Sequence, residues 1–374
     1  MGENIQDFRI TYSMNKLSET ARTFRRLGEA YESTADTCDE KNGFSRQLFL
    51  VADVLEECMT MQVRTKRLKR EDERNLVSRC MHYGIRIRDA RLLETSGGKY
   101  ELILQAKTIG HNCVSARKLG QAVSQAAQCG YMSDDYNHLI VGNQYQEFVF
   151  LQDDRFRILY GIARKNKGQE EVCGDNFMLK KLPCGKMSVA IADGMGVGEN
   201  AFRESRHVIE LMENCIEAGI EEKAAIDLIN SAYIAGGGIG NPVTIDMSVI
   251  NCQTGMMDCI KLGAAATFIK RDGWVEIIKS TTLPIGVLEN VDYDCTTKKL
   301  YHSDYVVMVS DGVLDNLAGI NKEEALAEII NCIEVRKPKA MAEEILEQSL
   351  SMHGMRAVDD CTVLVLGLFD TYDK

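Results

Sequence analysis

Very short connections between strand-like segments limit most strongly how this chain can fold. Gln253-Thr254-Gly255 and Arg271-Asp272-Gly273 each separate two apolar, strand-like segments by only three residues. Such a connection can join antiparallel neighbours, whereas parallel neighbours need a crossover of about a dozen residues or more. The second half of the chain is therefore predicted to form antiparallel sheets and not a doubly wound parallel sheet.

From residue 155 to residue 374 the sequence predicts one domain with many strands and two blocks of helices. Consecutive hairpins together with paired helices indicate an α+β fold, in which two stacked antiparallel β-sheets are flanked by helices. The helices are expected at Glu199–Ala218, Glu221–Ala235, Lys322–Ile333 and Pro338–His353. The strands are expected at Phe156–Ala163, Phe177–Leu182, Met187–Ala192, Ile245–Asn251, Met257–Leu262, Ala266–Lys270, Trp274–Lys279, Tyr305–Ser310 and Cys361–Phe369.

The first 154 residues divide into two further parts. Residues 1–82 are predicted to be a helical regulatory or dimerisation segment, because one apolar stripe includes Leu17 and Phe24 and a second runs through 48–59. The second helix is expected to continue through the charged run at 64–74 as a solvated face. Residues 83–154 are predicted to be a small α/β regulatory unit with a hairpin, one helix and a further strand.

Charge and cysteine content exclude several classes of protein. The formal net charge is −11 in 374 residues, so nucleic acid is not expected as a partner, because its binding needs a basic face. The 13 cysteines include no Cys-x-x-Cys pair, which favours reduced, buried thiols over a disulfide framework. Because the sequence has neither a long apolar run nor a basic and apolar leader, we expect a cytoplasmic location. If the chain is a fragment of a membrane-anchored protein, it would lie on the cytoplasmic face.

Aspartates stand at strand ends that an antiparallel arrangement brings together. In two segments an apolar strand ends directly in Asp-Gly, and in the other two segments the aspartate precedes a strand. The exit of one antiparallel strand lies beside the entry of its neighbour, so all four are predicted to share one rim of the sandwich. A single Asp-Gly is usually only a turn, but four segments in a consistent order favour a site. These segments are CGDNF (173–177), IADGMGVG (191–198), VSDGVLD (309–315) and VDDCTVLVL (358–366).

Carboxylates gathered on one rim repel each other unless cations lie between them. Oxygen ligands favour Mg²⁺ or Mn²⁺ over Zn²⁺, and the 6 histidines form no zinc motif. Two ions bridged by a carboxylate would activate water for in-line attack on phosphorus. Nucleotide binding is disfavoured, because Glu199 stands where a dinucleotide fingerprint needs glycine and the glycine run at 236–240 lacks the Lys-Ser/Thr of a P-loop.

The order GDN…ADGMG…SDG…DDCTVL resembles the PPM family of metal-dependent Ser/Thr protein phosphatases over residues 155–369. LGAAATFIKR (262–271), LPIGVL (283–288) and CMHYGIRI (80–87) are similar to its bacterial SpoIIE-type branch. The resemblance implies a two-metal phosphoprotein phosphatase. Its implied substrate is a phosphoserine on a STAS-domain anti-anti-sigma factor, whose dephosphorylation activates a sporulation sigma factor.

The resemblance also implies roles for individual residues around two Mn²⁺ or Mg²⁺ ions. Asp193 would bridge both ions, and Gly194 would offer its carbonyl to one of them. Asp311 and Asp359 would complete the other, and Asp175 would act at the second-metal site directly or through water. Asp193, Asp311 and Asp359 are the implied catalytic residues, and Asp360 and Arg164 are secondary candidates. Gly174-Asp175 stands where eukaryotic relatives have Glu-Asp, so a weak second-metal site is expected. Glu170 stands where they have a phosphate-binding arginine, so no phosphate-binding residue is assigned.

Two further expectations concern activity and assembly. The alternative to an enzyme is a catalytically silent scaffold with the same fold, which four mutually repelling aspartates disfavour. The helices of residues 1–82 have too little core to be stable alone. They are expected to pack on each other, on the sandwich domain or on a second copy in a homodimer. Contact with a membrane is expected only through a missing N-terminal region.

Overall fold

The computed structural model describes residues 17–29, 45, 48–56, 64–94, 99–110, 113–134, 137–167, 172–182, 185–196, 198–218, 220–235, 241–288, 291–351 and 354–371. Several sequence predictions concern residues outside these ranges. They are the glycine run at 236–240, the turn of the predicted hairpin at 96–98, Glu170 and residues 57–63 of the second predicted N-terminal helix.

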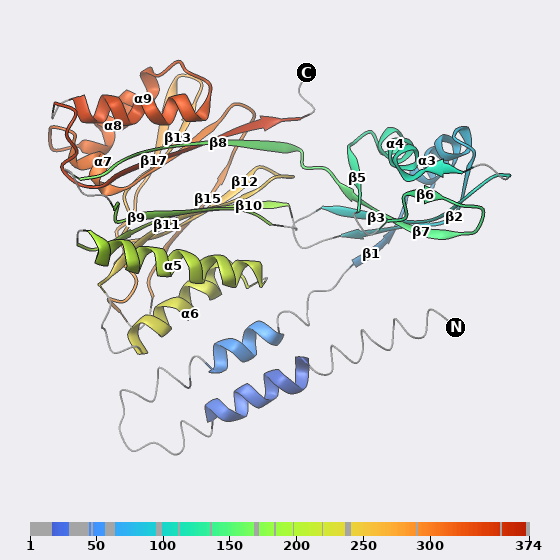
Figure 1. Cartoon of the computed structure of the whole chain (residues 1–374), viewed down its shortest axis with the longest axis horizontal. Helices are drawn as coiled ribbons and strands as arrows, with labels where there is room; N and C mark the ends of the chain where they lie inside the picture. The colour runs from blue at the N-terminus through green and yellow to red at the C-terminus, as the bar shows by residue number, and fades with distance from the viewer. Residues whose placement is uncertain are drawn as a thin grey trace.

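Two stacked antiparallel sheets of five strands form the C-terminal domain, which confirms the predicted α+β sandwich (Figure 1). The first sheet has the order β15-β12-β11-β10-β9, and the second has the order β14-β13-β16-β17-β8. The first sheet contains β9 (Asp175–Lys181), β10 (Lys186–Gly194), β11 (Val243–Asn251), β12 (Met256–Leu262) and β15 (Asp294–Lys299). The second contains β8 (Phe156–Lys165), β13 (Thr267–Arg271), β14 (Trp274–Ile278), β16 (Tyr305–Val309) and β17 (Cys361–Asp370).

Helices cover the outer face of each sheet, as Figure 1 shows. Strand β10 explains this layering, because Val189 and Ile191 belong to the core between the sheets, whereas Ala190 and Ala192 belong to the core under the helices. A strand buried on both faces is apolar at nearly every position, and β10 was predicted from the sequence for that reason. The helices are α5 (Glu199–Glu217) and α6 (Glu222–Ala235) on the first sheet, and α7 (Asp311–Asp315), α8 (Lys322–Cys332) and α9 (Pro338–Ser351) on the second.

The smaller unit is another five-stranded antiparallel sheet, in the order β1-β2-β3-β7-β5. Leu102, Leu104, Phe148 and Phe150 on its strands share one buried core with the helices. The elements are β1 (Arg64–Arg67), α3 (Arg70–His82), β2 (Ile85–Glu94), β3 (Tyr100–Thr108), β4 (Val114–Ser115), α4 (Ala116–Ala127), β5 (Tyr131–Ser133), β6 (Ile140–Val141) and β7 (Gln146–Gln152).

The prediction of a continuous helix through 64–74 was wrong for Arg64–Arg67. These residues form β1, which pairs with β2 so that Arg64 lies opposite Glu94. A short charged strand has neither of the apolar periods by which sequence distinguishes strand from helix. The helix begins only at Arg70, and Glu71, Asp72 and Glu73 lie in its first turn, where the helix dipole favours negative charge. The sheet of the small unit therefore begins at Arg64, earlier than the boundary predicted at residue 83.

The two N-terminal helices, at residues 17–29 and 48–56, contact each other. The Arg25 guanidinium lies 2.6 Å from the Asp53 carboxylate and 2.9 Å from that of Glu56. A Cβ atom at Gly28 would lie 2.7 Å from the Phe49 ring. Of the three packing arrangements predicted for these helices, contact with each other is therefore seen, and the homodimer stays a prediction. Within the described ranges, no helix combines the length and the apolar character needed to span a membrane.

Candidate active site

Two of the aspartates meet across neighbouring strands of the first sheet. Asp175 is the first residue of β9, Asp193 is the penultimate residue of β10, and the two are register partners. Thr244 on β11 is the next partner of Asp193. A Cβ atom at Gly194 would lie 2.2 Å from the carbonyl oxygen of Ala201, so only glycine allows β10 to approach α5 this closely.

The second sheet brings two more aspartates to the same rim. β16 ends at Val309, and Asp311 opens α7 directly after it, whereas Asp359 lies just before β17. The Ser310 N–H donates to the Thr362 carbonyl over 3.0 Å, which holds the exit of β16 beside the entry of β17. A Cβ atom at Gly312 would lie 2.1 Å from the Asp360 carbonyl oxygen, so the Asp-Gly pair is also required by packing.

Asp193 lies at the centre of the acidic cluster, which we define as Asp175, Asp193, Asp311 and Asp359. Burial raises its pKa to about 9, and the neighbouring Asp175, Asp311 and Asp359 raise the pKa in the same direction. Burial also raises the pKa of Asp175 to about 6, partly offset by the Thr362 and Ser310 hydroxyls. The pKa of Asp311 is raised by burial and then by Asp315 and Asp359.

The acidic cluster offers suitable ligand atoms for a hard cation. Asp175 is 1% exposed, and neither of its carboxylate oxygens makes a hydrogen bond of ordinary geometry within the described residues, although the Thr362 and Ser310 hydroxyls lie near enough to lower its pKa. Buried carboxylates of this kind are stabilised by a bound cation. In the described part of the chain, however, no three His, Cys, Asp or Glu side chains form a ready-made ligand shell. The residues therefore fit Mn²⁺ or Mg²⁺ by their chemistry, and binding would require side-chain rotation.

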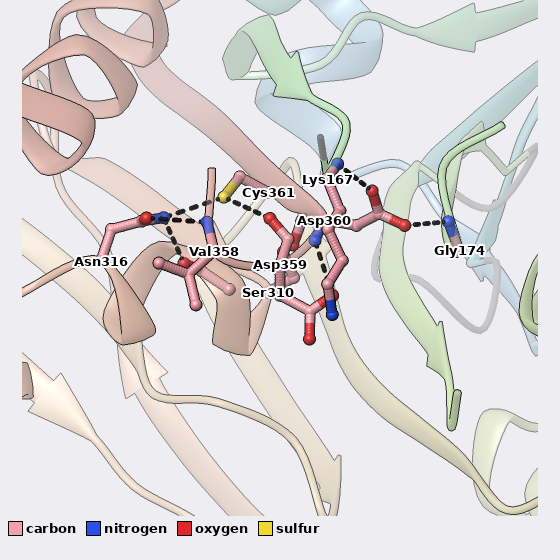
Figure 2. A network of polar contacts seen from close by, with 9 residues as sticks. Lys167, Gly174, Ser310, Asn316, Val358, Asp359, Asp360 and Cys361 are labelled. Atoms are coloured by element: carbon pink, nitrogen blue, oxygen red, sulfur yellow. Dashed lines mark hydrogen bonds and ion pairs between the residues drawn. The ribbon is translucent and has the colours of Figure 1, made fainter. Parts of the chain in front are cut away.

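Asp359 and Asp360 have different surroundings, as Figure 2 shows. The Asp360 carboxylate is buried and accepts two backbone N–H groups, from Lys167 over 2.7 Å and from Gly174 over 2.6 Å. It therefore anchors both ends of the segment between β8 and β9. The Asp359 carboxylate is partly exposed and lies 3.4 Å from the Lys167 ammonium. This geometry leaves Asp359 available as a ligand and gives Asp360 a structural role.

The structure adds Asn316, which sequence reasoning missed. Asn316 is fully buried and donates to the Gly312 carbonyl over 2.6 Å and to the Cys361 sulfur over 3.2 Å. It also accepts the Val358 N–H over 3.1 Å, so it joins α7 to the entry of β17 (Figure 2). Val358 and Cys361 lie 42 and 45 residues after Asn316 in the sequence. No local sequence pattern identifies a residue whose partners are this distant.

Two basic side chains border the acidic cluster. The Arg164 guanidinium donates to the Asp175 carbonyl over 2.5 Å, so this secondary candidate binds backbone across the two sheets. Lys167, which was not singled out from the sequence, has a 39% exposed side chain directed to Asp359. The sequence could have indicated Lys167, because it lies two residues after β8, at the rim where the aspartates gather.

Comparisons with known proteins assign the fold first. The solved structure of the PP2C phosphatase domain and a fragment of the regulatory domain of SpoIIE from Bacillus subtilis matches with a TM-score of 0.64 and 25% identity, and covers 88% of this chain and 95% of that chain. The RsbU and RsbW domains of a Mycobacterium tuberculosis protein share the fold, with a TM-score of 0.51 and 15% identity. This match covers 58% of this chain and 61% of that chain. The sandwich is thus the PP2C phosphatase fold.

The sequence family is equally clear. The model of the family described as Stage II sporulation protein E (SpoIIE) matches residues 183–369, so the chain belongs to this family. Stage II sporulation protein E of Bacillus subtilis (strain 168) is 26% identical over 329 residues, which are 88% of this chain and 40% of that protein. Stage II sporulation protein E of Priestia megaterium is 32% identical over 209 residues, which are 56% of this chain and 36% of that protein. The chain therefore spans less than half the length of either relative.

Proposed function

We propose that this chain is a Mn²⁺- or Mg²⁺-dependent serine/threonine protein phosphatase. The observation that carries the proposal is the Asp175 carboxylate, which is buried without a hydrogen bond of ordinary geometry in the described structure and is register partner to Asp193. Asp311 and Asp359 approach from the second sheet and raise the pKa of Asp193. Four carboxylates without enough compensating charge are expected to gather cations.

Each residue of the cluster has a proposed task. Asp193, with the carboxylate at the centre, would bridge two ions, and the Gly194 carbonyl would contribute to one of them. Asp311 and Asp359 would complete the other, and Asp175 would hold the second-metal site. When bound, the ions would supply an activated water and offset charge on the phosphoryl oxygens. Asp360 and Asn316 hold in place the segments that carry Asp175, Asp311 and Asp359.

Lys167 is our candidate for contacting the phosphoryl group. Its ammonium lies 3.4 Å from Asp359 and is partly exposed, so it can move toward a bound phosphate. Arg164 is less suited to this task, because its guanidinium already donates to the Asp175 carbonyl.

The proposed substrate is a phosphoserine on a STAS-domain anti-anti-sigma factor, with activation of a sporulation sigma factor as the consequence. Support for this substrate comes from membership of the SpoIIE family and from the motifs that resemble its members. Phosphate release from such a phosphoprotein and from an unrelated phosphoserine protein should be measured with Mn²⁺ and with EDTA. Mn²⁺-dependent release that is faster from the STAS domain supports the proposal. No release from either protein would favour the silent scaffold.

A further inference from the structure

A buried ion pair, Asp246 and Lys261, lies in the first sheet next to the acidic cluster and farther from the rim. Asp193 is paired with Thr244 on β11, and two residues further along, Ile191 is paired with Asp246. Asp246 is in turn paired with Lys261 on β12. Residues two apart on a strand point to the same face, and Ile191 belongs to the core between the sheets. Asp246 and Lys261 therefore lie in that same inter-sheet layer, directly behind the acidic cluster.

The pair is completely enclosed and well connected. The Lys261 ammonium lies 2.8 Å from Oδ2 of Asp246, and the two side chains are 1% and 2% exposed. Lys261 also donates to the Ala265 carbonyl over 2.6 Å, and Thr267 of the second sheet donates to Oδ2 of Asp246 over 2.5 Å. Apolar residues of similar volume are often at least as stabilising as a buried ion pair, because desolvation opposes the Coulomb attraction. Stability alone is therefore a weak explanation for this pair.

Asp246 borders the acidic cluster through a small cavity. Oδ1 is buried and has no hydrogen-bond partner among the described residues. Asp246 lines a cavity of about 20 Å³ together with Asp193, Thr244, Ser310 and Asp311. A cavity of this size has room for one water molecule, which needs two to four polar partners, and the polar residues of the lining can supply them. The cavity thus lies between two of the proposed metal ligands and Asp246, whose Oδ1 has no hydrogen-bond partner among the described residues.

We propose that Asp246 and Lys261 are positioning residues of the cation site, in which Asp246 Oδ1 reaches Asp193 and Asp311 through one water while Lys261 limits the negative charge. This inference rests on the proposed function. The Asp246 carboxylate adds attraction for a cation, and the Lys261 ammonium opposes it. The two charges therefore act on cation affinity with opposite sign, which a purely structural pair would not do. Loss of an outer-shell partner typically weakens metal affinity ~10–100-fold.

Mn²⁺ binding to the full chain, measured by isothermal titration calorimetry without a phosphorylated substrate, tests the inference. Asp246→Asn should weaken Mn²⁺ binding roughly tenfold or more. Lys261→Met should increase the affinity. The double variant should return to within about threefold of wild type, because the two changes are coupled. Near-UV circular dichroism checks the fold, and Lys261→Gln replaces Lys261→Met if the latter does not fold.

Asp304→Asn is the matched control. Asp304 is also buried and paired with a cation, since Nε of Arg271 lies 3.2 Å from its carboxylate, but it precedes β16 at the end opposite Asp311. This variant should lose stability and keep wild-type Mn²⁺ affinity. Equal affinities of wild type, Asp246→Asn and Lys261→Met, or equal weakening in both variants, would overturn the inference alone. Absence of Mn²⁺ binding by the wild type would overturn the proposed function and this inference with it.

Discussion

Asp359 and Asp360 are adjacent and chemically identical, yet their surroundings predict different responses to the same substitution. Asp359→Asn should abolish turnover with little loss of stability, because it removes a proposed ligand that is partly exposed. Asp360→Asn should keep more activity but lower the free energy of unfolding by about 1–3 kcal/mol, since the new amide group can accept only one of two backbone N–H groups. Urea unfolding and phosphate release measured on both variants check this pair. Equal effects in both assays would contradict the division of roles.

The raised pKa values predict how pH affects the metal-free protein. The pKa is about 6 for Asp175 and about 9 for Asp193 in the folded state, against an ordinary value of 3.8. The folded state therefore binds more protons than the unfolded state across this window. Its stability should fall as pH rises from about 4 to about 9. In EDTA, Asp193→Asn should be more stable than wild type near pH 9 and show a smaller decline above pH 6. Parallel curves for the two proteins would show that Asp193 is not the titrating group.

Lys167→Met tests the proposed phosphate contact. The variant should raise KM for a phosphoprotein several-fold with a smaller change in kcat, because a contact made to bound substrate contributes uniform binding. Lys165→Met, at an exposed position at the end of β8, is the matched control and should behave like wild type. An unchanged KM in Lys167→Met would show that Lys167 does not contact the phosphoryl group.

At the level of elements, the strand ends that carry the aspartates were predictable, whereas their supports were not. The central strands are rich in apolar residues on both faces, and Asp-Gly marks where β10 ends and where the chain leaves β16 for α7. The edge strands β1 and β15 are polar, so no apolar period identified them. Asn316 and Asp246 could not be recognised as parts of the site, because their significance depends on partners that only the folded chain brings near.

Asn316→Ala tests whether the link between α7 and β17 matters. The change leaves the Val358 N–H and the Gly312 carbonyl without this partner and should cost about 1–3 kcal/mol of stability. Displacement of Asp311 or Asp359 by ~1 Å can lower the rate ~100-fold, so kcat should fall more than the loss of folded protein explains. Thermal unfolding and kcat at saturating Mn²⁺ separate these effects. A stable variant with wild-type kcat would contradict this role.

At the level of the whole molecule, Asp154 connects the small unit with the sandwich. Its carboxylate lies 2.5 Å from the Lys99 ammonium and 2.6 Å from that of Lys181. Lys181 is the last residue of β9, and Asp175 is the first. A cavity of about 770 Å³ lies between the two units around these residues. The contact between the units thus reaches the strand that supplies a proposed ligand.

A chain that begins at Arg155 should therefore fold and bind Mn²⁺, but with an altered Mn²⁺ requirement or rate. Phe156 is buried in the core between the sheets, so this start preserves β8. Phe24→Asp or Leu55→Asp in the intact chain is predicted to reproduce the change, as a hypothesis that the N-terminal helices regulate the site. Mn²⁺ titrations of activity compare the three proteins with wild type. Superimposable Mn²⁺ titration curves would show that the first 154 residues do not regulate the site and serve only as a tether.

The central claim is that the acidic cluster holds the ions that drive phosphoester hydrolysis. The most direct measurement is phosphate release from a phosphoserine protein as Mn²⁺ is titrated, for wild type and Asp193→Asn. Wild type should be active only with Mn²⁺, and Asp193→Asn should be inactive at every Mn²⁺ concentration although it remains folded, because the central carboxylate is lost. Hydrolysis by wild type in EDTA, or near-normal hydrolysis by folded Asp193→Asn, would contradict the account.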